Sequence, residues 1–178
     1  MRIFGVIGWK NSGKTHLMVR LVSELTSRGY SVSTIKHAHH ALEFSTCDEE
    51  GREQRPVGAH EAIFSSAMRW SLTKETPTGA DEDPLSDLVA RLKPVDLVLV
   101  EGYKLEGHPK LEAYRAGSKR DLIARQDDRI VAVASNAELE NVNVPLFDLD
   151  DTIAIADFIV DFVGLAESPM AAGVGGSS

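Results

Sequence analysis

Cysteine is almost missing from this chain of 178 residues, which contains only Cys47. A single thiol excludes an intramolecular disulfide and a metal site built from several cysteines, and it suits a reducing compartment. No apolar run reaches the length of a membrane span, and the N-terminus enters an apolar segment without a signal-peptide pattern. From these absences we expect a cytoplasmic protein with no membrane partner.

The chain also lacks an excess of basic residues. It has 19 Lys and Arg against 27 Asp and Glu, a formal net charge of -8. Nucleic-acid-binding surfaces are basic, so this balance argues against a nucleic-acid partner. A charged fraction of 26% beside 43% hydrophobic residues is typical of a globular protein. We expect one domain over residues 1–165 and a disordered, glycine-rich tail over residues 166–178.

The most informative stretch is Gly-Trp-Lys-Asn-Ser-Gly-Lys-Thr at residues 8–15, directly after the apolar run 3–7. Glycine, four residues, glycine, lysine and threonine form the phosphate-binding loop pattern. The glycines let the backbone approach a polyphosphate, and successive N–H groups at a helix start bind its charge. Leucines at helical spacing over residues 17–25 predict the helix that the pattern requires. The predicted nucleotide-binding residues of this stretch are Gly8, Asn11, Ser12, Gly13, Lys14 and Thr15.

Two of these residues have further expected roles. Lys14 is expected to reach the β- and γ-phosphates as a catalytic residue, and the Thr15 hydroxyl to bind Mg²⁺. Residues 95–102 predict a buried strand that ends in Glu101, where an acid of a phosphate-loop fold faces the same ion. Glu101 is therefore predicted as a catalytic and metal-binding residue. Asp48, in the polar stretch 43–56, is a further candidate metal ligand.

Histidines follow the second predicted strand, over residues 30–36. His37, His39 and His40 lie within four residues, where the ends of strands carry ligands in doubly wound folds. Imidazole is a common metal ligand, but no second ligand cluster with recognisable spacing follows. We therefore expect His37 to lie near the nucleotide, with a metal site as the alternative.

The remaining segments predict an α/β fold of the phosphate-loop NTPase type: a mostly parallel sheet flanked by helices, with an extended, hairpin-like insertion. The hairpin is expected within residues 58–73, helices over 84–92 and 151–163, and strands over 129–136 and 145–148. In the last helix, four residues are expected to pack inward: Ile155, Phe158, Ile159 and Phe162.

Residues 110–115 alternate, with Leu111 and Ala113 on one side and Lys110, Glu112 and Tyr114 on the other. This pattern predicts a strand with one charged side, at a sheet edge or a partner surface. Lys104, Lys110 and Arg115 are candidate contacts for a phosphorylated ligand. Asn136 follows a predicted strand at the position from which phosphate-loop GTPases read the base. No Asn-Lys-x-Asp box is present, so the sequence does not fix the base.

Several of these segments together resemble the MobB family, the molybdopterin-guanine dinucleotide biosynthesis adaptor proteins. The resemblance covers nearly the whole chain and rests on residues 8–15, 36–40, 101–104 and 109–112. It implies a GTP-binding homodimer with weak GTPase activity and Mg²⁺ that assists the guanylyltransferase attaching GMP to molybdopterin, with molybdopterin as a candidate ligand. The stretch 51–55 is shorter than its counterpart in the family, and Asn136 stands where the family often has aspartate.

Two other functions fit the same loop. A small-molecule kinase needs a lid with arginines, for which Arg52 and Arg55 are candidates, but no acceptor site is visible in the sequence. A metallochaperone GTPase would use the histidine cluster to carry nickel.

Overall fold

The computed structural model describes residues 1–37, 61–65, 70–74, 83–117 and 120–166. These residues fall into two compact units, residues 1–37 with 85–178 and residues 38–84. In the smaller unit, β3 (Glu61–Ser65) pairs antiparallel with β4 (Trp70–Lys74). This two-stranded sheet is the predicted hairpin insertion. The expected single domain over 1–165 stays a prediction, and residues 167–178 of the expected tail lie outside the described ranges.

The larger unit is built on a six-stranded sheet whose neighbours are all parallel, in the order β2-β5-β1-β6-β7-β8. Its elements are β1 (Arg2–Ile7), α1 (Lys14–Ser27), β2 (Val32–Lys36), α3 (Leu85–Ala90), β5 (Leu97–Glu101), β6 (Lys110–Tyr114), the short 3-10 helix η4 (Ile123–Arg125), β7 (Ile130–Ser135), β8 (Leu146–Asp148) and α4 (Thr152–Val163). The predicted α/β class is confirmed, and the predicted elements lie within a few residues of the observed ones.

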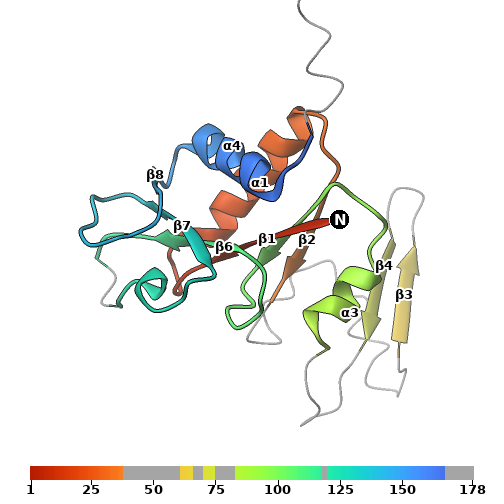
Figure 1. Ribbon diagram of the computed structural model, residues 1–178. Helices are drawn as coiled ribbons and strands as arrows, with labels where there is room; N and C mark the ends of the chain where they lie inside the picture. The colour runs from red at the N-terminus through yellow and green to blue at the C-terminus, as the bar shows by residue number, and fades with distance from the viewer. Residues whose placement is uncertain (38–60, 66–69, 75–82, 118–119, 167–178) are drawn as a thin grey trace, which may run out of the picture. The chain divides into compact units, whose positions relative to one another are not determined.

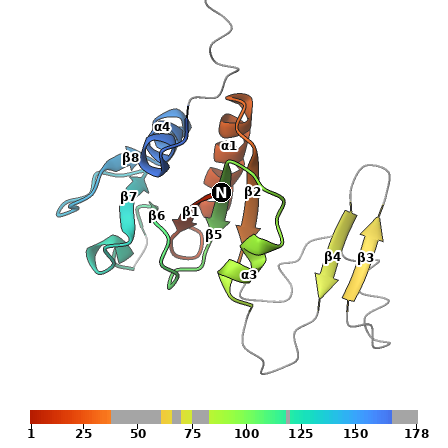
Figure 2. The ribbon, with the colours of Figure 1, turned by 45° about the vertical axis from the view of Figure 1, so that its right-hand side comes forward.

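Strand β1 occupies the centre of this sheet, between β5 and β6 (Figure 2). Ligands of doubly wound folds bind where connections from neighbouring strands leave in opposite directions, outside the carboxyl ends of the strands. The loop after β1 is at this point. The strand order therefore places residues 8–13 where a ligand is expected.

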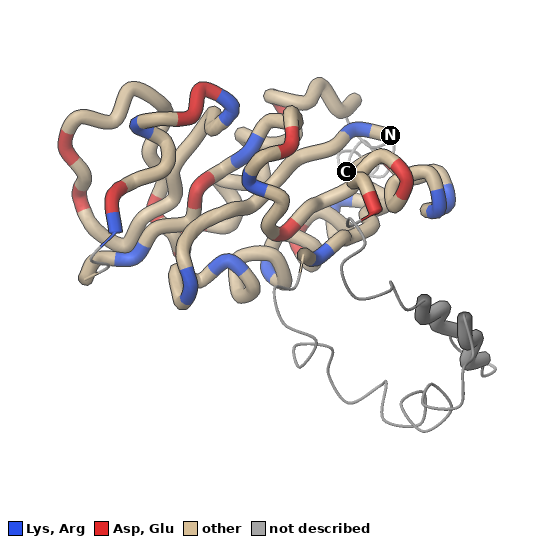
Figure 3. The backbone as a smooth tube through the Cα atoms, turned by 90° about the horizontal axis from the view of Figure 1, so that it is seen from below, with Lys and Arg blue, Asp and Glu red and all other residues tan. Residues whose placement is uncertain are grey.

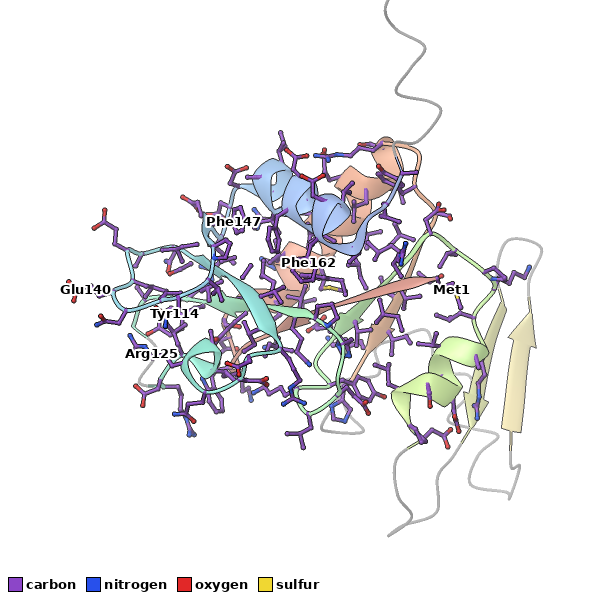
Figure 4. All side chains as sticks on the ribbon, viewed as in Figure 1. Met1, Tyr114, Arg125, Glu140, Phe147 and Phe162 are labelled. Carbon is purple, nitrogen blue, oxygen red and sulfur yellow. The ribbon has the colours of Figure 1, made fainter. Side chains whose placement is uncertain are left out.

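Helices α1 and α4 lie side by side over one face of the sheet (Figure 1). They cover Phe4, Val6, Leu99 and Leu111, which are fully buried. Figure 4 shows Phe147 and Phe162 on the same side of the sheet as α4. The other face has a smaller cluster in which Leu85 of α3 packs with Val98 and Val100.

The inward face of α4 was predicted correctly for three of its four residues. Ile155 and Ile159 are fully buried, and Phe158 is partly buried against the core. Phe162 is 48% exposed, although its ring contacts Phe4 at 6.2 Å and Phe158 at 5.5 Å. It lies in the last turn of the helix, beyond which the chain turns at Gly164.

The prediction of an exposed edge strand over residues 110–115 is wrong. β6 is an interior strand between β1 and β7, and Lys110 and Glu112 are fully buried. The Lys110 ammonium donates to the backbone carbonyls of Glu106 and His108. Burial of these charges is tolerated because backbone groups of the covering segment satisfy them. Lys110 is thus not available to a phosphorylated ligand.

His108 packs over β1 on the side of the sheet opposite α1. A Cβ added to Gly5 would lie 2.6 Å from Nε2 of His108, so the ring occupies the space that a side chain would take. Within the part of the chain that the structure describes, neither ring nitrogen has a hydrogen-bond partner. Burial, followed by the charges of Lys110 and Arg129, lowers the pKa of His108 from 6.5 to about 4.

This lowered pKa predicts a dependence of stability on pH. Between pH 4 and pH 6.5 the unfolded chain binds a proton at His108 that the folded chain does not, so the free energy of unfolding rises with pH across that window. His108→Leu should flatten the rise, because the side chain no longer titrates. Urea unfolding at pH 4.5 and pH 7 measures both slopes, and equal slopes in the two proteins would contradict this assignment.

Candidate functional site

The loop between β1 and α1 has the backbone shape of a phosphate-binding turn. Gly8 has φ 149° and Gly13 has φ 94°, and Asn11 between them is also left-handed at 64°. A Cβ on Gly8 would lie 2.3 Å from the carbonyl oxygen of Ala113 and 2.5 Å from Oγ of Ser12. Glycine at residue 8 is therefore required by contact with β6 as well as by its dihedral angle.

The N-terminus of α1 is open toward this loop. Gly13 precedes the helix, no side chain caps it, and its first turn contains no acidic residue. The first N–H groups of a helix have no partner within the helix and carry a partial positive charge. Ser12 adds a buried hydroxyl, in a residue only 6% exposed, which has no hydrogen-bond partner among the described residues. These groups together form a cradle suited to an anion.

Lys14 lies across the same loop. Its ammonium donates to the backbone carbonyl of Trp9 over 2.7 Å. The side chain thus folds back over the turn, and its charge stays beside the open N-terminus of α1. The structure brings all the predicted residues of the stretch 8–15 into one turn, and their role in nucleotide binding stays a prediction.

Thr15 and Glu101 meet at the carboxyl edge of the sheet. β1 and β5 pair with Val6 opposite Glu101, so the strand that precedes the loop ends beside the acid. The Thr15 hydroxyl donates to Oε1 of Glu101 over 2.8 Å, and Lys36 Nζ lies 3.9 Å from the same oxygen. Glu101 is 7% exposed. A hydroxyl and a carboxylate oxygen at this distance are ligand types that fit Mg²⁺.

His37 adjoins this pair. Its backbone N–H donates to the backbone carbonyl of Glu101, and its ring lies 4.7 Å from the ring of Tyr103. Gly102 and Tyr103 both have left-handed φ, 93° and 50°, and a Cβ on Gly102 would approach Cβ of His37 to 3.0 Å. Left-handed backbone at a non-glycine residue is uncommon and is found most often at functional turns. The structure thus places His37 beside Glu101, and its expected position near the nucleotide stays a prediction.

Other predicted site residues lie outside the described ranges. These are His39, His40, Asp48 and the stretch 51–55. Within the ranges that the structure describes, no group of three or more His, Cys, Asp or Glu could hold a metal ion. In the same ranges no helix is long and apolar enough to cross a membrane. The histidine metal site and the role of Asp48 stay predictions.

Asn136 follows β7, as expected, and its side chain is engaged in the fold. Its Oδ1 accepts from the N–H of Ala116 over 2.8 Å, which holds the end of β6 to the end of β7. The amide oxygen is the only acceptor in this side chain. A role in reading a base stays a prediction, and in this conformation the amide NH₂ group is the part not engaged by Ala116.

Trp9 was not predicted as a site residue, yet it anchors the loop. Its indole N–H donates to the carbonyl of Asp121 over 2.9 Å, and Lys104 Nζ lies 4.1 Å from the ring centroid. Arg120 lies over the same ring at 5.0 Å. Such cation–π contacts stabilise by about 0.5–2 kcal/mol. Lys104, expected as a phosphate ligand, packs on Trp9, and burial lowers its pKa.

Glu112 fixes the segment that Trp9 contacts. Its carboxylate accepts from the N–H groups of Ile123 at 3.1 Å and Ala124 at 2.8 Å. Burial raises the pKa of Glu112, while these two N–H groups and Lys104 favour the charged form. The sequence signal for this pairing was an acid between Leu111 and Ala113, which the alternation had assigned to a charged side of the strand.

Next to the open end of α1 lies a cavity of about 340 Å³. Its lining comes from α1 and from the ends of β6 and β8: Gly13, His16, Val19, Arg20, Arg115 and Asp150. A Cβ on Gly13 would lie 3.0 Å from Nε of Arg115, so this guanidinium packs directly on the phosphate-loop glycine. Of the basic residues expected to meet a phosphorylated ligand, Arg115 is the one that the structure places at the loop with its guanidinium exposed to a cavity.

The geometry can be compared with known proteins. The family model described as MobB, molybdopterin guanine dinucleotide synthesis protein B, matches residues 3–136. The molybdopterin-guanine dinucleotide biosynthesis adapter protein of Escherichia coli (strain K12) is 36% identical over 160 residues, 87% of this chain and 89% of its own. The protein of that name from Haemophilus influenzae is 35% identical over 164 residues, 90% of this chain and 89% of its own.

Solved structures of MobB proteins have the same fold as this chain. The crystal structure of a MobB protein homolog from Bacillus stearothermophilus is 27% identical, with a TM-score of 0.66 over 93% of this chain and 100% of its own. Bacillus subtilis MobB is 25% identical, with a TM-score of 0.67 over 92% of this chain and 98% of its own. With a family model over most of its length and relatives above 30% identity, this chain belongs to the MobB family of molybdopterin guanine dinucleotide synthesis proteins.

Proposed function

We propose that this chain is a GTP-binding adapter in molybdopterin-guanine dinucleotide biosynthesis, where it assists the guanylyltransferase that attaches GMP to molybdopterin. It acts as a homodimer in the cytoplasm and hydrolyses GTP slowly. The observation that supports this most directly is the contact of Thr15 with Glu101 at the open N-terminus of α1. This contact places a hydroxyl, a buried carboxylate and Lys14 around one anion cradle.

The residues divide the work of holding the triphosphate. The N–H groups of the turn 8–15 bind phosphate oxygens, and the Lys14 ammonium leaves the Trp9 carbonyl for the β- and γ-phosphates. Thr15 and Glu101 are the residues that would hold Mg²⁺, and the ion would supply positive charge against the phosphates. Glu101 would link the ion to the turn after β5, because His37 donates its backbone N–H to the Glu101 carbonyl and its ring contacts the ring of Tyr103.

The names of the two relatives support the adapter role, since both are called biosynthesis adapter proteins. An adapter needs nucleotide-dependent binding to its enzyme more than fast turnover. Phosphate-loop proteins accelerate hydrolysis by about a thousandfold or more when an arginine contacts the transferring phosphate. Arg115 packs on Gly13 and lines the cavity, and Arg120 lies over the ring of Trp9. The structure thus places both arginines away from the Thr15–Glu101 pair.

Lys14→Ala should abolish GTP binding while leaving the fold intact, because it removes the charge that reaches the phosphates and little buried surface. Calorimetry of GTP with Mg²⁺ measures the affinity, and circular dichroism checks the fold. The matched control is Lys10→Ala, an exposed lysine of the same loop, which should retain most of the affinity. Unchanged GTP affinity in the Lys14 variant would show that the loop does not bind the triphosphate.

Glu101→Gln should weaken the effect of Mg²⁺ by about tenfold or more, as loss of a group that supports a metal does. Glutamine keeps the size of the side chain and can still accept from Thr15, but the negative charge is lost. The readout is the ratio of GTP affinities with and without Mg²⁺, compared with the exposed Glu138→Gln as control. An unchanged ratio would remove Glu101 from the metal site.

The adapter role is tested with the purified guanylyltransferase. We expect the chain to bind that enzyme by biolayer interferometry, more tightly with GTP and Mg²⁺ than without nucleotide, and the Lys14→Ala variant to lose this difference. Transfer of the γ-phosphate to a small molecule would favour a kinase, and absence of binding to the enzyme under both conditions would count against an adapter.

A further inference from the structure

The cavity beside Gly13 begins at the open N-terminus of α1 and continues along the helix. Gly13 and His16 lie at its start, and Val19 and Arg20 lie about one helical turn further on. A volume of about 340 Å³ is at the lower end of the range for small-molecule sites. Figure 1 shows that α4, which follows β8 in the chain, lies beside α1.

Arg115 gives the start of the cavity a cation. It follows β6 directly and packs on Gly13. No hydrogen bond or ion pair involves its guanidinium among the residues that the structure describes. A guanidinium has five donors in a fixed plane and suits phosphate or a stacked ring. This end of the cavity therefore suits the α-phosphate of a nucleotide whose other phosphates occupy the turn.

Asp150 gives the far end an acceptor. Arg20 holds it in place: Nη1 donates to Oδ1 over 3.1 Å and Nη2 donates to the carbonyl of Leu149 over 2.6 Å. The backbone N–H of Asp150 also donates to Oδ1 of Asp148 over 2.8 Å. The second carboxylate oxygen has no partner in the described ranges, and the side chain is 74% exposed. A fixed carboxylate with a free oxygen thus lies at the cavity wall.

We propose that this cavity is the nucleoside subsite and that Asp150 selects guanine. The inference rests on the proposed function, since it assumes that the triphosphate occupies the turn 8–15. Guanine presents two neighbouring donors, N1–H and the 2-amino group, which a carboxylate can accept. Adenine presents an acceptor at N1, which a carboxylate repels. Asp150 would then supply the acceptor that Asn136, engaged by Ala116, does not.

Electrostatics favour this orientation of the nucleotide. Arg115 and the N-terminus of α1 are positive and face the phosphates, whereas Asp150 is at the end of the cavity one helical turn away, where the base would lie. The opposite orientation would place phosphates against a carboxylate. The pairing of Asp150 with Arg20 leaves one oxygen for the base and keeps the side chain from turning away.

Asp150→Asn tests the inference because it exchanges one acceptor oxygen for a donor. Calorimetry with Mg²⁺ compares GTP, xanthosine triphosphate (XTP) and ATP on the full chain. We expect GTP affinity to fall about tenfold or more, as loss of a bidentate contact to a base does, and XTP affinity to rise, since the amide can donate to the 2-oxo group of xanthine. The matched control is Asp161→Asn, an exposed acid of α4, which should change neither affinity.

The outcomes separate this inference from the proposed function. If wild-type protein binds GTP with Mg²⁺ and Asp150→Asn keeps the same preference, the guanine-selecting role is overturned and the GTP site stands. Equal affinities of the wild type for GTP and ATP overturn the selection as well. If the wild type binds no nucleotide, both proposals fail. Circular dichroism and an unchanged dependence on Mg²⁺ confirm that the variant is folded.

Discussion

One hydrogen bond, from the Thr15 hydroxyl to Glu101, depends on the whole order of the sheet. The two residues are 86 positions apart in the sequence and meet because β1 and β5 are parallel neighbours with Val6 opposite Glu101. A slip of one residue in that register would turn the acid to the other face. The buried apolar residues on both faces of β1 and β5 fix the register, so the hydrophobic core determines the geometry of the polar site.

The sequence predicted the parts of this protein whose signals are local. Residues 8–15 match the phosphate-binding loop pattern at its two glycines, lysine and threonine, and β5 is an apolar run with one terminal acid. Helices α1 and α4 were evident from their apolar spacing. The position of Glu101 beside Thr15 followed from a general property of parallel sheets, in which carboxyl ends share an edge. No residue-specific information about the pairing was needed.

The buried charges were not predictable in the same way. Lys110 and Glu112 alternate with apolar residues, as they would in an edge strand, and local alternation cannot distinguish water from backbone partners. Their partners are carbonyls of residues 106 and 108 and N–H groups of residues 123 and 124. The same holds for Trp9, whose contacts come from residues 104, 120 and 121. Side-chain–backbone contacts across such distances leave no spacing in the sequence.

The segment that these buried charges hold also limits how the loop can move. Trp9 is fixed to Asp121 and packed against Lys104, and Glu112 fixes the turn at residues 123 and 124 that follows. Figure 3 shows basic and acidic residues interspersed along the described backbone, and the formal net charge of -8 gives a triphosphate no long-range attraction. In the proposed function, affinity for the triphosphate comes from groups already positioned: the open end of α1, Lys14 and Arg115. Binding to a turn that is preorganised in this way costs little conformational entropy, because the turn is shaped by contacts that do not involve the ligand.

The first turn of α1 has two neighbouring faces with different surroundings. Thr15 and His16 are adjacent on α1, about 100° apart around its axis, so one face adjoins Glu101 and the next adjoins the cavity. The proposed ion binding and the proposed base selection can therefore vary independently on the same helix turn.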